Sequence, residues 1–179
     1  MKAVTYSEYA PDDNYAKILK VQDIDDPKPK ADEVVFEVKS AALNYNDIWG
    51  MRGVPVAVPL PHVSGSDAAG DVIAVGDDVK NIKVGDKVVS HSNMSCRVCK
   101  ACTDGREFDC IKRTIWGFQT GPNWGAFQEV THLPEVNISK IPEGVSYDDA
   151  AAASMTILTS WHMLVGRAKI TPGQTVLIM

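Results

Sequence analysis

All four cysteines of the chain lie in one short segment, and no other feature constrains its fold as tightly. The segment is CRVCKACTDGREFDC, residues 96–110, with the spacing C-x2-C-x2-C-x7-C. Short spacings let a tight turn direct neighbouring sulfur atoms to one point, and four thiolates match the tetrahedral coordination of Zn²⁺. The spacing therefore predicts a structural Zn²⁺ site whose ligands are Cys96, Cys99, Cys102 and Cys110.

Two other arrangements of the same thiols are open on the residues alone. Two disulfides would close only very small loops here, whereas disulfide frameworks usually join distant parts of small secreted chains. An iron–sulfur cluster is the other alternative, but the bacterial ferredoxin run has three residues before its last cysteine and a proline after it. Here seven residues precede Cys110, and Ile111 follows it. A zinc ion with four protein ligands has no open position, so we expect it to stabilise a loop and the function to lie elsewhere.

Composition and charge indicate a folded chain without a polyanionic partner. The chain has 179 residues, of which 45% are hydrophobic, so a sizeable core is possible. The net charge of −5 argues against nucleic acid or an anionic membrane as the main partner. The N-terminal MKAVTYSEYA has no apolar signal core. The most apolar run, residues 150–165, contains Ser, Thr and His and is shorter than the ~20 residues of a membrane span. We expect no membrane association and a cytoplasmic location.

Short segments typical of β-strands dominate residues 1–145. They have β-branched or apolar residues between Pro- and Gly-containing turns. Many short strands at regular spacing are typical of a barrel or sandwich, so we expect a mainly β (α+β) fold. The expected strands are MKAVTY, AKILKVQDI, EVVFEVKSAAL, DVIAVG, DKVVSH, AFQEVTHL and NISKI.

The hydrophobic pattern changes after residue 145. Ser146 and Asp149 form S-x-x-D, a variant capping box, and the following AAAASMTILTSWHMLV is apolar nearly all round, which predicts a buried helix. KITPGQ then predicts a turn, and TVLIM, residues 175–179, predicts a buried strand. A helix followed by a buried strand typically begins an α/β domain. We therefore expect one domain over residues 1–145, and in 146–179 a connecting helix and the first strand of a truncated second domain.

The order of these segments resembles the N-terminal, GroES-like domain of the medium-chain dehydrogenases/reductases, which include zinc-type alcohol dehydrogenases and quinone oxidoreductases. The resemblance implies a GroES-like β-barrel with a zinc lobe, followed by a Rossmann domain of which TVLIM is the first strand. It also implies NADP(H) or NAD(H) as cofactor of the complete protein, a small-molecule substrate, and a homodimer or homotetramer. The matching segments are AALNYNDIWGMRG, GSDAAGDVIAVGDDV, KVGDKVV, the cysteine segment and AAAASMTILTSWHML.

The resemblance also implies that the catalytic zinc of the family is missing. Its three ligand positions, a Cys, a His and another Cys or similar ligand, fall on Asn44, Ser66 and Met155, and none of these is a good zinc ligand. The neighbouring acidic residues persist as Asp47 and Asp67. This pattern resembles the zinc-independent reductases, which reduce an activated double bond or a quinone. The segment IWGFQT, residues 115–120, is also similar to one in enoyl-thioester reductases of the superfamily.

Without a Lewis acid, hydrogen-bond donors must stabilise the charge that collects on oxygen when hydride adds to a conjugated C=C bond. Asn44, Tyr45 and Asn46 carry such donors in the matching segment. We predict Asn44, Tyr45 and Asp47 as catalytic residues. The resemblance implies that Asn46 and Thr159 contact the cofactor. Turn formation by the asparagines, helix N-capping by Asp47 and a bond from Thr159 to its own helix are the corresponding structural alternatives.

Three functional hypotheses follow. We favour part of an NAD(P)H-dependent oxidoreductase without catalytic zinc. The second hypothesis is part of a zinc-dependent alcohol dehydrogenase with unusual ligands. The third is a non-enzymatic GroES-like binding module, since fold does not imply function, although it leaves the cysteine segment unexplained. Because no G-x-G-x-x-G phosphate loop occurs in the sequence, we expect this chain alone to bind no dinucleotide tightly and to be inactive.

Overall fold

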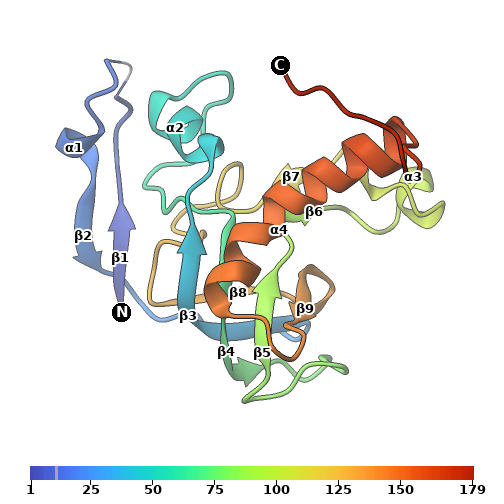
Figure 1. Ribbon diagram of the computed structural model, residues 1–179. Helices are drawn as coiled ribbons and strands as arrows, with labels where there is room; N and C mark the ends of the chain where they lie inside the picture. Colours follow the sequence, from blue (N-terminus) through green and yellow to red (C-terminus); the bar gives the residue numbers. More distant parts are fainter. Residues whose placement is uncertain (11) are drawn as a thin grey trace.

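The computed structural model describes residues 1–10 and 12–179 (Figure 1). Most of its regular elements are strands. The strands are β1 (Lys2–Thr5), β2 (Lys20–Asp23), β3 (Glu33–Ala42), β4 (Asp67–Val75), β5 (Lys87–Ser90), β6 (Asn93–Met94), β7 (Thr114–Ile115), β8 (Val130–Pro134) and β9 (Ile138–Lys140). The α-helices are α1 (Tyr15–Ile18), α2 (Tyr45–Arg52), α3 (Lys100–Thr103) and α4 (Tyr147–Trp161), and a π-helical turn, His162–Arg167, follows α4.

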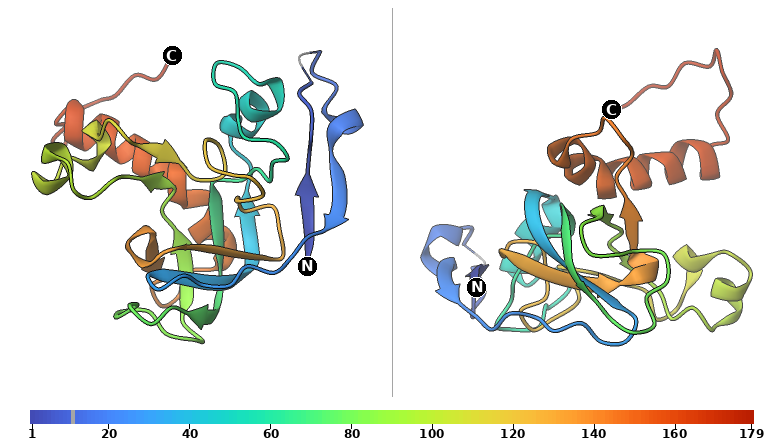
Figure 2. Two further views of the ribbon diagram at one scale, coloured as in Figure 1. Left: turned by 180° about the vertical axis from the view of Figure 1, so that it is seen from behind. Right: turned by 90° about the horizontal axis from the view of Figure 1, so that it is seen from below.

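The central element is a curled five-stranded antiparallel sheet with the strand order β8-β3-β4-β5-β9 (Figure 2). Its longest pair, β3 with β4, has register shifts between Val35 and Phe36 and between Val38 and Ser40. Such irregularities increase the local twist of a strand pair, which helps the sheet to curl. The β1–β2 pair is a separate sheet, and a bridge between Ala3 and Gln128 joins it to the segment just before β8. The mainly β fold is therefore confirmed, and the expected barrel takes the form of a half-barrel.

The main core lies inside the curl of this sheet. Alternate residues of the strands point inwards, as the period of two requires. Their side chains form one cluster with the fully buried Trp116, which comes from the loop after β7. The completely or almost completely buried strand residues of this cluster are Val34, Phe36, Val72, Val88 and Leu133.

Helix α4 crosses the sheet and packs against β3, β4 and β5 (Figure 1). Its predicted N-cap is confirmed, because the Ser146 Oγ accepts a hydrogen bond from the backbone N–H of Asp149 at 3.0 Å. The prediction of a buried helix is wrong for this structure. Only Ala150, Ala151 and Met155 are buried, because one side of the helix meets the sheet and α2 while much of the rest of its surface is exposed.

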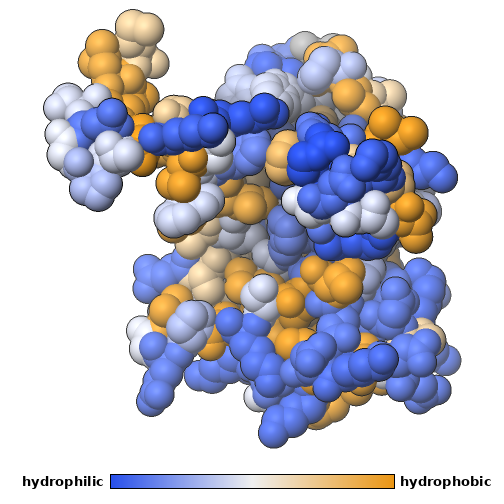
Figure 3. All heavy atoms as spheres, turned by 90° about the vertical axis from the view of Figure 1, so that its right-hand side faces the viewer, coloured by the Kyte–Doolittle hydropathy of each residue, from blue (hydrophilic) through white to orange (hydrophobic). Residues whose placement is uncertain are grey.

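Two expected strands differ from the structure. TVLIM forms no strand, and Leu177 and Ile178 are 82% and 88% exposed at the hydrophobic tip of a projecting segment (Figure 3). A strand needs a neighbouring strand for its backbone hydrogen bonds, and none of the described strands lies beside this segment. AKILKVQDI divides into α1 and β2, which lie on either side of Leu19. The expected domain boundary at residue 145 stays a prediction.

The cysteine lobe, residues 95–113, projects from the sheet at the side of Figure 1 where α3 lies. It leaves the sheet after β5 and returns through β7, and the short β6–β7 pair forms its base. In the part of the chain that the structure describes, no helix is long and apolar enough to span a membrane.

Gly117 is required by the close approach of two loops. Its φ is +73°, and a Cβ atom there would lie 1.8 Å from the carbonyl oxygen of Gly65. This places the IWGFQT segment directly against the loop that precedes β4. Gly85 has a similar φ of +88°, but a Cβ there would meet open space.

We predict that Gly117→Ala destabilises the chain more than Gly85→Ala. Both variants carry the left-handed backbone penalty of about 1–2 kcal/mol. Only Gly117→Ala adds a steric clash, for which we expect a further ~1–3 kcal/mol. Urea unfolding of both variants measures the difference, and equal losses of stability would contradict the observed loop contact.

Candidate functional site

Helix α2 begins at Tyr45, and the side chain of the preceding Asn44 caps it. The Asn44 Oδ1 accepts a hydrogen bond from the backbone N–H of Asn46 at 3.4 Å, and the Asn44 backbone N–H donates to the Asp47 Oδ2 at 2.8 Å. This reciprocal arrangement is a capping box. The suggestion that Asp47 is the N-cap was therefore wrong, because Asp47 is the third residue of the helix and reaches back to Asn44.

Asp47 also joins α2 to the loop before β4. Its Oδ1 accepts a hydrogen bond from the backbone N–H of Gly65 at 3.0 Å. Burial raises the pKa of Asp47 to about 6, the backbone N–H groups of Asn44 and Gly65 oppose this shift, and the nearby Asp67 carboxyl adds to it. Asp47 therefore links α2 to the loop before β4 through hydrogen bonds to its carboxyl group, whose pKa is about 6.

Asp67, at the start of β4, makes a matching contact with α4. Its Oδ1 accepts a hydrogen bond from the backbone N–H of Met155 at 2.6 Å. Burial also raises the pKa of Asp67. On the same side of α4, the Nδ2 atoms of Asn44 and Asn46 each lie 3.3 Å from the Met155 Sδ, as donors to a sulfur acceptor.

These contacts bring five of the residues singled out in the sequence into one place. We call them the Asn44 cluster: Asn44, Asn46, Asp47, Asp67 and Met155. A thioether is a weak acceptor, so the hydrogen bonds that orient these two amide groups are weak. The cluster thus presents two oriented carboxamide donors beside two buried carboxyl groups.

The chemistry of this cluster does not fit a catalytic zinc. The side chains at the three family ligand positions offer an amide, a hydroxyl and a thioether, whereas zinc sites use thiolate, imidazole and carboxylate. Among the described residues, only the four cysteines form a group of His, Cys, Asp or Glu that could hold a metal. The hydroxyl of Ser66 is completely buried and has no partner among the described groups.

Two predicted site residues lie outside the Asn44 cluster. Tyr45 is 58% exposed, and its ring meets Trp49 edge-on at 5.3 Å between centroids. Trp49 is also 6.5 Å from the Phe118 ring, so three aromatic residues lie beside the cluster. The spacing of four residues between Tyr45 and Trp49 on one helix is the sequence signal that could have predicted this ring contact. Thr159 is exposed on α4, one turn after Met155, and lines a cavity at the cysteine lobe.

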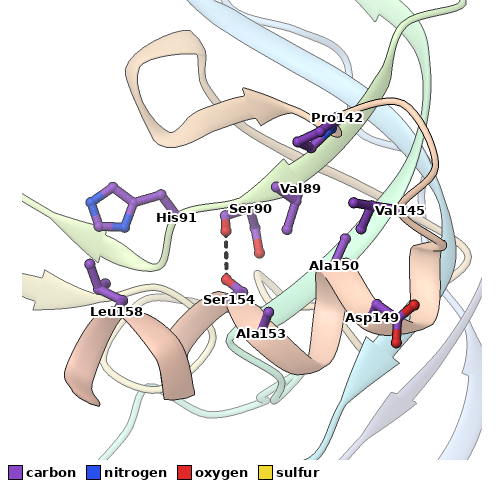
Figure 4. Close-up of a pocket in the computed structure, with 10 residues that line it drawn as sticks. All are labelled: Val89, Ser90, His91, Pro142, Val145, Asp149, Ala150, Ala153, Ser154 and Leu158. Carbon is purple, nitrogen blue, oxygen red and sulfur yellow. Dashed lines mark hydrogen bonds between the residues drawn. The ribbon is translucent and has the colours of Figure 1, made fainter. Parts of the chain in front are cut away.

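A mainly apolar cavity of about 450 Å³ lies between β5 and α4 (Figure 4). Val89 projects from β5, and Ala150 and Ala153 project from α4, so small side chains leave the space open. The hydroxyl of Ser154 donates to the Ser90 carbonyl oxygen at 2.6 Å and holds the two elements together.

The four cysteines of the lobe converge as predicted. Their Sγ atoms all lie within 4.8 Å of one another, with contacts of 3.5 Å between Cys96 and Cys110 and 3.9 Å between Cys96 and Cys102. Around an ion bonded at about 2.3 Å, four tetrahedral sulfur atoms lie about 3.8 Å apart. Backbone N–H groups of Val98 and Cys99 lower the pKa of the Cys96 thiol to about 6, which favours the thiolate. The donor set and its geometry fit Zn²⁺.

Known proteins resemble this chain over most of its length. The crotonyl-CoA carboxylase/reductase of Cereibacter sphaeroides is 36% identical over 89% of this chain and 38% of its own length. The acryloyl-coenzyme A reductase of Metallosphaera sedula is 28% identical over 89% of this chain and 47% of its own length. The crystal structure of an NAD-dependent alcohol dehydrogenase matches with a TM-score of 0.88 and 36% identity, covering 97% of this chain and 49% of that one.

The chain therefore spans less than half the length of each of these proteins. The family model described as the alcohol dehydrogenase GroES-like domain matches residues 30–143. This range includes the curled sheet, α2 and the cysteine lobe, which together hold most of the site described above. The chain carries an alcohol dehydrogenase GroES-like domain and belongs to the medium-chain dehydrogenase/reductase superfamily.

Proposed function

We propose that the whole protein is an NAD(P)H-dependent reductase of an activated C=C bond or a quinone that uses no catalytic metal. The observation that carries this proposal is the pair of carboxamide donors, from Asn44 and Asn46, that meets on the sulfur of Met155. They occupy the place where zinc-dependent relatives are expected to hold their ion. Hydrogen-bond donors are suited to an enolate-like oxygen, whereas an alkoxide formed from a simple alcohol calls for a Lewis acid.

A bound reduced nicotinamide would supply the hydride to one carbon of the C=C bond, and the residues of this chain stabilise the charge that develops on the acceptor oxygen. The proton that completes the reduction comes from water or from the Tyr45 hydroxyl. The Asn44 and Asn46 amides release a weak sulfur acceptor and donate to the more basic oxygen of the substrate. Because these donors lie in a largely buried environment, their hydrogen bonds to a developing charge are stronger than in water. Asp47 positions Asn44 through the capping box, while Tyr45 and Thr159 face the cofactor and substrate from outside the cluster.

The relatives support this proposal and indicate a narrower chemical class for the hydride acceptor. Two of them are named for crotonyl-CoA and acryloyl-CoA, which are thioesters with a C=C bond conjugated to the carbonyl. We therefore propose an enoyl thioester as the preferred substrate class. The similarity to an NAD-dependent alcohol dehydrogenase favours the second candidate, a zinc-dependent alcohol dehydrogenase. The zinc content of the whole protein separates the two candidates.

We predict about one zinc per chain, bound by Cys96, Cys99, Cys102 and Cys110. Cys99→Ser should lose most of the metal and lower the unfolding temperature, because metal-binding free energy is folding free energy for such a site. Thr103→Ala, on the same lobe, is the matched control and should retain zinc. Elemental analysis and thermal unfolding measure both effects. Iron, or disulfides in non-reducing mass spectrometry, would contradict the assignment, and a second zinc would favour the alcohol dehydrogenase.

We predict that Asn46→Ala lowers kcat of the whole protein with an enoyl thioester by roughly 100-fold, the usual loss for one oxyanion donor. Asn46 is the sharper choice because Asn44 also caps α2, and its loss would itself cost about 1 kcal/mol of stability. Asn81→Ala removes an exposed carboxamide from the loop between β4 and β5 and serves as control. Steady-state kinetics decide the matter: a change in KM alone would argue against a role in the transition state.

We predict that ionisation of Asp47 destabilises the folded chain. Its folded-state pKa, about 6, lies above the ordinary value of 3.8, so the stabilisation is present below about pH 4 and is lost as the pH rises through 6. The shift corresponds to up to about 3 kcal/mol. Relative to Asp47→Asn, the natural chain should therefore lose stability between pH 4 and pH 7.5.

Denaturant unfolding at both pH values measures this difference, and Asp77→Asn, which removes an exposed carboxyl, controls for net charge. A constant difference between the natural chain and Asp47→Asn would contradict the raised pKa, because it would mean that the hydrogen bonds from Asn44 and Gly65 fully offset the effect of burial.

A further inference from the structure

A second cavity, of about 400 Å³, lies between the cysteine lobe and the end of α4. This volume falls in the range of about 300–1,000 Å³ that is typical of small-molecule sites. Phe108 and Arg113 line it from the lobe, and Thr159 and Arg167 line it from α4 and the π-helical turn. Because Thr159 follows Met155 by one helical turn, the cavity lies next to the Asn44 cluster along α4.

The five arginines of the chain fall into two groups, three that form ion pairs and two that line this cavity. Three of the five form ion pairs with carboxylates. The other two, Arg113 and Arg167, form no ion pair with any group in residues 1–10 and 12–179, and both line this cavity. Two cations without a described counter-ion in one cavity favour an anionic ligand.

Both guanidinium groups are held in place but keep most of their donors. The Arg113 Nη1 donates to the Phe108 carbonyl oxygen at 2.6 Å. The Arg167 Nε donates to the His162 Nε2 at 3.2 Å, and its guanidinium lies 5.5 Å from the centroid of the Phe108 ring. Each guanidinium has five N–H donors in a planar fork that matches phosphate oxygens, so these contacts orient the groups without exhausting them.

The remaining polar groups of the cavity agree with an anionic ligand. Glu107 is the one carboxylate among the described lining residues, and it pairs with Arg97 at 3.3 Å, which offsets its charge. The Ser95 hydroxyl is buried and has no partner among the described groups, so it can donate to a ligand oxygen.

We propose that this cavity binds a phosphate or pyrophosphate group, with Arg113 and Arg167 as its main ligands. The inference rests on the proposed function in one respect, because it takes the phosphate-bearing molecule to be a reactant at the adjoining Asn44 cluster. The phosphorylated nucleotide tail of a coenzyme A thioester carries this chemistry. The nicotinamide dinucleotide, whose pyrophosphate is expected on the phosphate loop of a Rossmann domain, is the alternative source that the test below distinguishes. In either case the phosphate site lies beside the segment of α4 that contributes Met155 to the Asn44 cluster.

Inorganic pyrophosphate is the probe, titrated into the zinc-loaded chain by calorimetry. We expect saturable binding that weakens with added salt, as for any partly exposed charge pair. Arg167→Gln and Arg113→Gln should each weaken binding by about tenfold or more, as expected when a charge-assisted hydrogen bond is lost. Arg106→Gln, a lobe arginine already paired with Asp109, should leave it unchanged, and Glu107→Gln should tighten it.

The absence of saturable binding, or an equal loss in Arg106→Gln, overturns the proposal. Because Arg113 also contacts the lobe backbone, Arg167→Gln keeps the test valid if Arg113→Gln does not fold. In the whole protein, Arg167→Gln should raise KM for a coenzyme A enoyl thioester but not for a short thioester without phosphates. A rise in KM for NADPH alone would identify the dinucleotide as the source. If the whole protein reduces neither thioester, the proposed function is wrong. The calorimetric titration with pyrophosphate still decides whether the cavity binds phosphate groups.

Discussion

The arrangement of the candidate site depends on two buried carboxyl groups that accept hydrogen bonds from backbone N–H groups of distant segments. Asp47 joins α2 to Gly65, and Asp67 joins the start of β4 to Met155 of α4. Each carboxyl loses hydration on burial, which raises its pKa, and each recovers part of that loss by accepting hydrogen bonds. Together with the packing of α4 on the sheet, these hydrogen bonds hold α2 and α4 where the Asn44 and Asn46 amides reach the Met155 sulfur.

The same hydrogen bonds explain why polar chemistry gathers at the edge of an otherwise apolar core. The interior of the curled sheet is filled by aliphatic and aromatic side chains, which offer no acceptors for a polar loop. Segments 44–47 and 65–67 instead satisfy one another and α4. Gly117 lies directly against the carbonyl oxygen of Gly65, so the backbone of the IWGFQT segment also helps to position this loop.

Features carried by local spacing were predictable. The cysteine spacing predicted one four-sulfur group, and the sulfur atoms meet within 4.8 Å. The S-x-x-D signal located the start of α4, because an N-cap is a contact between residues three apart in sequence. Predictions that needed a partner at a distance were less successful. TVLIM has strand propensity but no described strand beside it, and the apolar surface of α4 is only partly covered by the sheet.

The sequence by itself determined the mainly β class, the cysteine group, the N-terminus of α4 and the residue types at the Asn44, Ser66 and Met155 positions. These follow from composition, from contacts within a few residues and from an ordered family pattern. Only the tertiary structure decided that the Asn44 amide meets the Met155 sulfur, and that Arg113 and Arg167 share one cavity. Those pairings join residues more than fifty positions apart, and the chain brings such residues together only when the sheet curls and α4 packs across it.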